Sequence, residues 1–207
     1  MEKNSINIGR FLGKLEKSFK FVGKNEDERM YFNFLIVKRK SNSYDRIPIV
    51  VKEEFLPRIN SDNDGMDKVY INGEIIANTI DGKHMMFVYV LGPIVFVPNA
   101  SNDINNVTIN GRICSKPRLQ ALSHGRFICD FMLCSFSEEN KRIYTPIICW
   151  DEIAGRISNC KIGNKLNISA RFQSRRFSKR ENDGSVIEKE AYELSIIKLK
   201  SIYIKGS

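Results

Sequence analysis

A segment that occurs twice constrains the fold of this chain more than any other feature. Residues 46–59, RIPIVVKEEFLPRI, align without gaps on residues 144–157, YTPIICWDEIAGRI, at an offset of 98 residues. Four further blocks follow in the same order: NIGRFLG with TINGRICSK, FNFLIVK with CDFMLCS, KVYINGEI with KLNISARF, and KHMMFVYVL with KEAYELSII. Five blocks in one order indicate a duplicated domain, and 207 residues suit two domains of about 100 residues each.

A short polar stretch separates the two copies. Residues 99–106 follow Pro98 and read NASNDINN, a composition typical of an exposed linker. We therefore predict an N-terminal domain over residues 1–98, a linker over 99–106 and a C-terminal domain over 107–207.

Each copy has the pattern of a small β-barrel. Residues 107–113 and 166–172 alternate between apolar and polar side chains, as strands with one buried face do. Between the third and fourth strands the apolar spacing is helical, but Pro57 and Gly155 keep any helix short. Three strands, a short helix and two strands describe the OB-fold. We predict an all-β protein with short helices, built as two tandem five-stranded OB-fold barrels.

The charge of the chain favours a polyanionic partner. It carries 33 Lys and Arg against 24 Asp and Glu, a net charge of +9. The excess lies mainly in the second copy, since residues 1–100 carry 15 basic and 13 acidic side chains and residues 101–207 carry 18 and 11. Nucleic acid and an anionic membrane surface are the leading partners of such a chain.

Several other classes are excluded by what the sequence lacks. It has no signal-peptide core and no stretch near the ~18 apolar residues of a membrane helix, so we expect a cytoplasmic protein with no membrane partner. The cysteines show no CxxC spacing and are predicted to be reduced and buried. They are Cys114, Cys129, Cys134, Cys149 and Cys160.

Metal and catalytic chemistry are not expected either. His84 and His124 have no second ligand at a metal-binding spacing, so we predict no metal and no cofactor. The acidic pairs Asp151-Glu152 and Glu138-Glu139 consist of neighbours that do not converge easily on one metal ion. We predict that the protein is not an enzyme.

The second copy resembles the bacterial and phage single-stranded DNA-binding family along most of its length. The first strand runs from Asn106-Val107 to Gly111-Arg112 and is followed by a polar loop with Pro117. Two aromatic residues, Tyr144 and Trp150, stand six apart on the third strand, and a basic stretch on the fourth ends at Phe177. Phe136 falls near a further aromatic of the family. The resemblance implies binding and protection of single-stranded DNA in replication, recombination or transfer.

The residue chemistry independently favours the same function. Six residues along a strand place Tyr144 and Trp150 on one face, about 20 Å apart. Aromatic rings there stack on any base, and cations beside them neutralise phosphates. The predicted interface comprises these two rings with Phe177 and Phe136, the cations Arg171, Arg175, Arg176, Lys179 and Arg180 of the fourth strand and its hairpin, and Arg112, Lys116, Arg118 and Arg126 around the first loop.

The first copy lacks this aromatic platform. By the alignment, Arg46 replaces Tyr144, Lys52 replaces Trp150 and Ile80 replaces Phe177. A basic cluster remains as a secondary nucleic-acid site that follows phosphates without holding bases. It comprises Lys38, Arg39, Lys40, Tyr44, Arg46 and Lys52. The apolar residues 85–97 are candidates to pack beyond their own barrel.

The resemblance also bears on assembly. Members with two OB-folds in one chain commonly form dimers that carry four folds, so we expect a homodimer. The family's acidic, Phe-terminated C-terminal tip is absent from the sequence, which ends in IYIKGS: either the tail has been lost, or it has been truncated, or the chain comes from a mobile element that uses other contacts.

Alternatives stay open at this point. Trp150 and Phe177 also fit a role in the core, and the basic hairpin also fits a solvated loop. A primosome-type or RNA-binding OB protein, or an OB-fold adaptor for protein assembly, fits the same fold.

Overall fold

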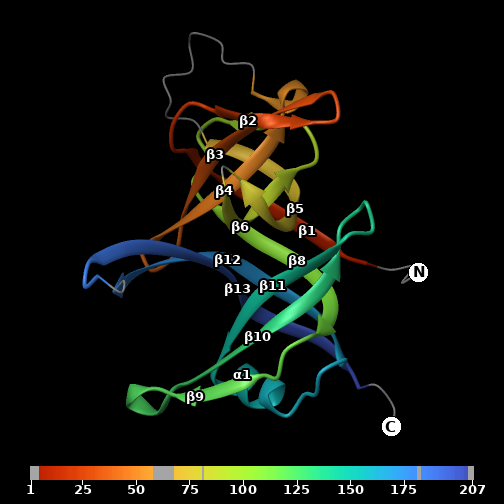
Figure 1. The fold of residues 1–207 in the computed structure, drawn as a ribbon, viewed down its shortest axis with the longest axis vertical. Helices are drawn as coiled ribbons and strands as arrows, with labels where there is room; N and C mark the ends of the chain where they lie inside the picture. Colours follow the sequence, from red (N-terminus) through yellow and green to blue (C-terminus); the bar gives the residue numbers. More distant parts are fainter. Residues whose placement is uncertain (1–4, 58–67, 81, 181–182, 205–207) are drawn as a thin grey trace.

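The computed structural model describes residues 5–57, 68–80, 82–180 and 183–204. It shows two β-barrels, one above the other along the long axis of the molecule (Figure 1). The first comprises β1 (Asn7–Leu15), β2 (Lys20–Asn25), β3 (Glu28–Lys38), β4 (Tyr44–Lys52), the 3-10 helix η1 (Glu53–Phe55), β5 (Lys68–Ile80), β6 (Lys83–Val90) and β7 (Val95–Val97). The second comprises β8 (Ile104–Ile113), β9 (Arg118–Ala121), the 3-10 helix η2 (Ser123–Gly125), β10 (Phe127–Phe136), β11 (Arg142–Trp150), α1 (Asp151–Ser158), β12 (Lys165–Arg180) and β13 (Val186–Tyr203).

The two barrels repeat one pattern of strand pairing. In the first, β1 pairs antiparallel with β3 and β5, β3 with β4, and β5 with β6, and a parallel pairing of β4 with β6 closes the barrel. In the second, β8, β10, β11, β12 and β13 repeat these pairings. The predicted tandem five-stranded OB-folds are confirmed, with β2, β7 and β9 as additional strands.

The expected short helix after the third barrel strand is realised differently in the two copies. In the second copy it is α1. In the first copy it is the single turn of η1, since the chain turns extended at Leu56, directly before Pro57. Residues 58–67, which complete this part of the predicted helix, lie outside the described residues.

Strand register tests the sequence repeat residue by residue. Lys14 pairs with Ile36 in the first barrel, and Arg112 pairs with Cys134 at the equivalent place in the second. Both residues of the second pair lie 98 positions after those of the first. Gly111 therefore corresponds to Gly13, not to Gly9 as the first sequence block implies. A shift of four residues leaves every side chain on the same face of a strand, so the hydrophobic pattern does not detect it.

The second sequence block is out of register by one residue. It aligns Phe34 with Phe131, yet the pairs Leu35–Ile47 and Leu133–Thr145 show that Phe34 corresponds to Met132. Phe131 is buried in its barrel, whereas Phe34 lies on the outer face and is half-buried. Matching identical residues was misleading here, because one residue along a strand reverses the face.

The first strands of the two barrels join them into one sheet. β1 and β8 pair antiparallel over six residues, from Asn7–Ile109 to Leu12–Ile104. Gly9 pairs with Val107, its own counterpart at the offset of 98, so the ladder relates the barrels by a local pseudo-twofold axis. Each barrel thus extends the sheet of the other.

This ladder includes part of the segment interpreted as a linker. Residues 104–106 of the segment 99–106 belong to β8 and pair with β1. The Asp103 carboxylate lies 2.6 Å from Lys68 Nζ and accepts the Lys38 backbone N–H. The Asn105 side-chain amide donates a hydrogen bond to the Phe172 carbonyl at 2.8 Å and accepts one from the Phe172 backbone N–H at 2.9 Å. Polar composition did not reveal these contacts, because their partners lie about 35 to 67 residues away.

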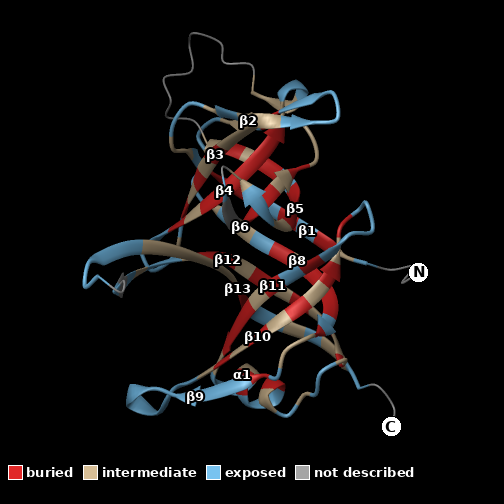
Figure 2. Ribbon diagram, in the orientation of Figure 1, coloured by how far each residue is buried: buried red, intermediate tan, exposed pale blue. Residues whose placement is uncertain are grey.

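Alternate residues of each strand fill the barrels, as Figure 2 shows by the burial along the strands. Phe11, Leu35 and Ile71 are fully buried in the first barrel, and Leu133 and Phe172 in the second. All five cysteines are free thiols; Cys129 and Cys149 are buried and the others half-buried. In the described part of the chain, no helix has the length and apolarity needed to cross a membrane.

The close crossing of β8 and β10 gives a test of the fold. A Cβ atom added at Gly111 would lie 2.5 Å from the Cys134 carbonyl oxygen and 2.9 Å from Leu133 Cγ. We expect Gly111→Ala to lower the free energy of unfolding by about 1–3 kcal/mol, since β8 and β10 would have to separate. Gly155→Ala on α1 is the matched control, because its added Cβ meets nothing within 4 Å. Alanine also favours a helix over glycine by about 0.5–1 kcal/mol, so this variant is expected to lose no stability. Urea unfolding measures both, and equal stability of Gly111→Ala and the unmodified protein would contradict the crossing.

Candidate nucleic-acid interface

A groove of about 730 Å³ lies on the outer face of the second barrel. Its floor consists of side chains of β10 and β11, and its walls come from β9 and from the base of the β12–β13 hairpin. Figure 1 shows the hairpin and the β9 arm projecting on the same side of this barrel. The lining includes Lys116, Arg118, Gln120, Ile128, Asp130, Met132, Pro146, Ile148, Trp150, Gln173, Arg175 and Glu193.

Strand alternation positions the aromatic side chains on this face. On β11, residues 143, 145, 147 and 149 are buried in the barrel, so Tyr144 and Trp150 both face outward. Across the ladder, Trp150 pairs with Ile128 and Tyr144 with Cys134. Tyr144 is 50% exposed and Trp150 half-buried, so neither ring belongs to the core. Trp150 lines the groove, and Tyr144 stands beyond its other end.

Trp150 is held by its neighbours at the start of α1. The Arg126 guanidinium lies 4.9 Å from the indole centroid, within cation–π range. Asp151 fixes that guanidinium, accepting hydrogen bonds from Arg126 at 2.9 and 3.2 Å, and it also accepts the backbone N–H of Phe127. These donors lower the pKa of the Asp151 carboxyl. The ring is therefore oriented before any ligand binds.

The walls of the groove carry cations that are partly neutralised. Arg118 donates to Asp130 at 2.6 and 3.0 Å, yet its side chain is 74% exposed. Arg175 lies 4.0 Å from Glu193 and over the Phe177 ring at 5.4 Å. Burial raises the pKa of the Glu193 carboxyl, with Arg175 acting against it. A mainly apolar floor, with Asp130 held by Arg118, between exposed guanidiniums suits a ligand with flat rings on one side and anionic groups on the other.

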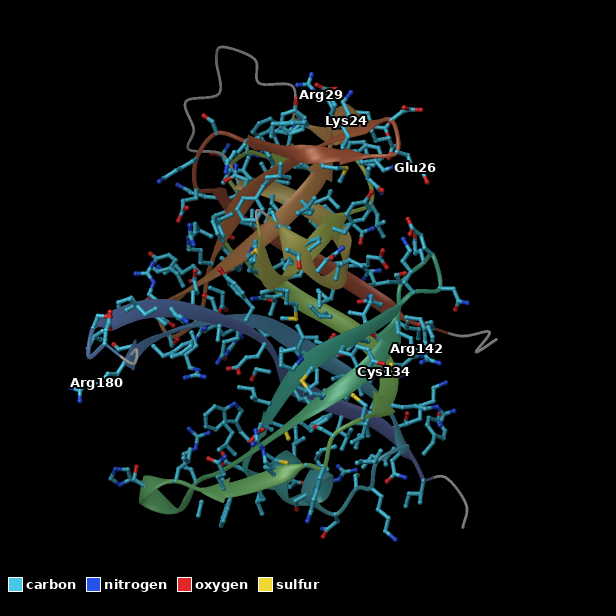
Figure 3. All side chains as sticks on the ribbon, in the orientation of Figure 1. Lys24, Glu26, Arg29, Cys134, Arg142 and Arg180 are labelled. Atoms are coloured by element: carbon cyan, nitrogen blue, oxygen red, sulfur yellow. The ribbon has the colours of Figure 1, made fainter. Side chains whose placement is uncertain are left out.

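Other predicted residues lie around the groove instead of in it. Phe177 is half-buried on the hairpin, and Arg180 lies toward its tip (Figure 3). Arg176 faces the opposite side of the ribbon, near Glu16 of the first barrel. Phe136 ends β10 opposite Arg142, and exposed Arg112 lies on β8. The Lys179 side chain falls outside the described residues.

Arg171 differs from its predicted role. Its guanidinium lies 3.5 Å from the buried carboxylate of Asp45 in the first barrel. Burial lowers the pKa of Arg171, and Asp45 acts against this. Arg39 forms a second ion pair with Asp45. Arg171 and Arg39 therefore contribute to the contact between the barrels, and Arg171 also donates to Gln173 of the groove lining.

Arg46 also holds the barrels together. Its guanidinium donates twice to Glu16 at 2.7 Å and once to Glu190 of β13 at 2.9 Å. Its backbone N–H bonds Ser174 Oγ of β12, and the guanidinium carbon lies 3.2 Å from the Phe34 ring centroid. The bond to Glu16 raises the pKa of Arg46. Three of the six residues predicted as a secondary site, Arg39, Arg46 and Lys52, are thus engaged in ion pairs.

The remaining members of that cluster differ in their surroundings. Lys52 forms an ion pair with Glu28 at 2.7 Å. Lys38, Lys40 and Tyr44 are exposed.

Apolar side chains cover the region of the first barrel that corresponds to the groove. Met30, Val50 and Phe87 are buried there in a separate apolar cluster. Met30 and Val50 correspond to Ile128 and Ile148 of the groove floor. Further apolar side chains from four strands pack on the cluster: Val22, Phe32, Ile76, Ile80, Met85 and Tyr89. The first barrel therefore fills the face that the second leaves open.

Comparison with known proteins shows the fold. No protein-family model matches the chain, and no curated protein matches it in sequence. The wild-type single-stranded DNA binding protein from Thermus aquaticus is similar in structure, with a TM-score of 0.66 and 15% identity over 99% of this chain and 96% of that chain. A deletion mutant of that protein gives a TM-score of 0.66 and 16% identity over 95% and 94%. Nearly complete coverage of both chains shows that the two share a two-OB-fold architecture.

A third similar structure covers a single barrel. The N-terminal domain of PriB from Thermoanaerobacter tencongensis gives a TM-score of 0.38 and 22% identity over 45% of this chain and 98% of that chain. It is too distant to support an argument.

The contacts of Arg46 give a second test. We expect Arg46→Gln to lower the free energy of unfolding by about 1–3 kcal/mol, since Glu16 and Glu190 lose a partner where they are half-buried. Because Arg46 makes no phosphate contact in this arrangement, the salt dependence of oligonucleotide binding stays unchanged. Lys40→Gln, at an exposed position, is the control and changes stability by less than about 0.5 kcal/mol. Unchanged stability together with a salt slope lowered by about 0.7 would instead assign Arg46 to a phosphate.

Proposed function

We propose that this protein binds single-stranded DNA without sequence specificity and protects it during replication, recombination or transfer. The observation that carries the proposal is the open groove of the second barrel, with Trp150 in its lining and Tyr144 on the same outer face. Every base has a π-face, so stacking on these rings holds extruded bases of any sequence. A base pair in a duplex does not offer this face.

The charges around the groove support a nucleic-acid ligand. Arg118 and Arg175 expose 74% and 57% of their side chains on opposite walls, and the basic hairpin extends beyond the barrel. Cations on both walls of a mainly apolar floor match a strand whose phosphates flank its bases. The similar protein from Thermus aquaticus is named as a single-stranded DNA binding protein, which supports the same ligand here.

We also propose that the two barrels have different roles in binding. The second holds bases, whereas the first, with its outer face filled, positions the β12–β13 hairpin through Arg46 and Asp45. The proposed role is non-catalytic. In support, Asp151 and Glu139, one from each acidic pair, are engaged by Arg126 and Lys141.

Stacking at Trp150 gives a direct test, because it is the single tryptophan of the chain. We expect oligo-dT to quench its fluorescence at low ionic strength. Tyr144→Ala combined with Trp150→Ala should weaken binding, measured by anisotropy of a labelled oligonucleotide, by about 2 to 6 kcal/mol if each ring stacks on one base. Phe21→Ala is the control, since it removes an exposed ring of the first barrel.

Two outcomes of that experiment favour other functions. Tighter binding of ribo-oligonucleotides than of poly-dT in competition would assign the groove to RNA. Full biological function of the double alanine variant would favour a role as an assembly adaptor.

We propose in addition that two chains form a homodimer with four OB-folds. The pairing of β1 with β8 occupies one edge of each first strand within the chain, so a second chain must associate through another surface. Sedimentation equilibrium is expected to give twice the mass of one chain. A single-chain mass at concentrations well above those used for DNA binding would contradict the dimer.

A further inference from the structure

Five side chains form a continuous row around the second barrel, beginning at Tyr144. Strand register pairs Tyr144 with Cys134, Cys134 with Arg112, Arg112 with Lys165, and Lys165 with Tyr203. The row therefore crosses β11, β10, β8, β12 and β13 in that order. Neighbouring strands lie about 4.8 Å apart, so the two tyrosines are about 19 Å apart along the row.

The row has an exposed aromatic ring at each end and cations between them. Tyr144 is 50% exposed and Tyr203 is 61% exposed. Arg112 is exposed, and it donates to the Gly163 carbonyl. Lys198 and Lys200 add two exposed cations further along β13, Lys198 opposite Ser169. This chemistry matches that of the groove, and it uses Arg112, which the groove leaves out.

A small polar pocket lies at the far end of the row. It has a volume of about 230 Å³ and is lined by Asn110, Lys165, Leu166, Asn167 and Tyr203. Asn167 Oδ1 is buried and has no hydrogen-bond donor within the described structure. The polar side chains of this lining suit the hydrogen-bonding edge of a base.

Building on the proposed function, we infer that single-stranded DNA leaving the groove at Tyr144 continues around the second barrel over Arg112 and Lys165. It ends with a base stacked on Tyr203 at the polar pocket. Continuity with the groove and the basic charge of the row identify the occupant as the same strand of DNA. The bound strand is then longer than the groove alone accommodates.

Oligonucleotides of two lengths test this path, with the anisotropy of the labelled oligonucleotide as the readout for both. One of about 5 nucleotides fills the groove, and one of about 16 also reaches Tyr203. We expect Tyr203→Ala to weaken binding of the longer DNA by about 5- to 100-fold, the equivalent of one lost base stack, and to leave the shorter DNA unaffected. Tyr203→Phe keeps the ring and is expected to bind like the unmodified protein.

The salt dependence of binding tests the contribution of Lys165 separately. Lys165→Gln is expected to lower the salt slope by about 0.7 for the longer DNA and to leave that of the shorter DNA unchanged. Lys161→Gln is the matched control, an exposed lysine in the loop before β12 and off the row.

Failure of this inference is distinguishable from failure of the proposed function. Unchanged binding of the longer DNA by Tyr203→Ala, while Trp150→Ala weakens both lengths, would overturn the path and leave the groove in place. An equal loss for both lengths would also overturn it, because Tyr203 would then support the structure of the groove. If neither length binds the unmodified protein, the proposed function itself fails.

Discussion

The antiparallel ladder between β1 and β8 is the interaction on which the rest of the molecule depends. It places two equivalent strands side by side, with Gly9 opposite its own counterpart Val107. The barrels are thereby fixed at the distance where side chains of one reach the other. The buried carboxylate of Asp45 then accepts hydrogen bonds from Asn105 and from the Ser174 backbone of the second barrel. Without the ladder these polar contacts would be long-range and too costly in chain entropy to form alone.

A common topology has produced two different outer faces. The floor positions Ile128 and Ile148 correspond to Met30 and Val50, so apolar character is kept in both copies. What differs is the cover: Phe87 and its apolar neighbours fill this face in the first barrel, whereas Gln173, Arg175 and Glu193 only flank it in the second. An apolar face that is covered contributes to stability, and the same face left open is available to a ligand.

The sequence was sufficient for the architecture and for the two rings, because both depend on local periodicity. Alternation of period two placed Tyr144 and Trp150 on one outer face, and the repeat supplied the topology twice. The roles of Arg46 and Arg171 were not predictable in this way. Arg46 meets Glu16 and Glu190, which lie 30 and 144 residues away, and composition contains no signal for such partners. The covered outer face of the first barrel was not predictable from the sequence either, because Phe87 has the sequence context of an ordinary core residue.

The length of the second hairpin connects these observations. β12 and β13 have 16 and 18 residues, against 13 and 8 in β5 and β6, so their ribbon extends beyond its barrel. Alternate residues give the ribbon two faces: Ser174 and Glu190 meet Arg46, while Arg175 and Glu193 line the groove. Arg46 itself stands on the outer face of β4, at the position of Tyr144. If the first barrel had an open groove, the position of Arg46 would serve ligand binding, as that of Tyr144 does in the second barrel. Because the outer face of the first barrel is covered, Arg46 is available to bind the β12–β13 ribbon of the second barrel.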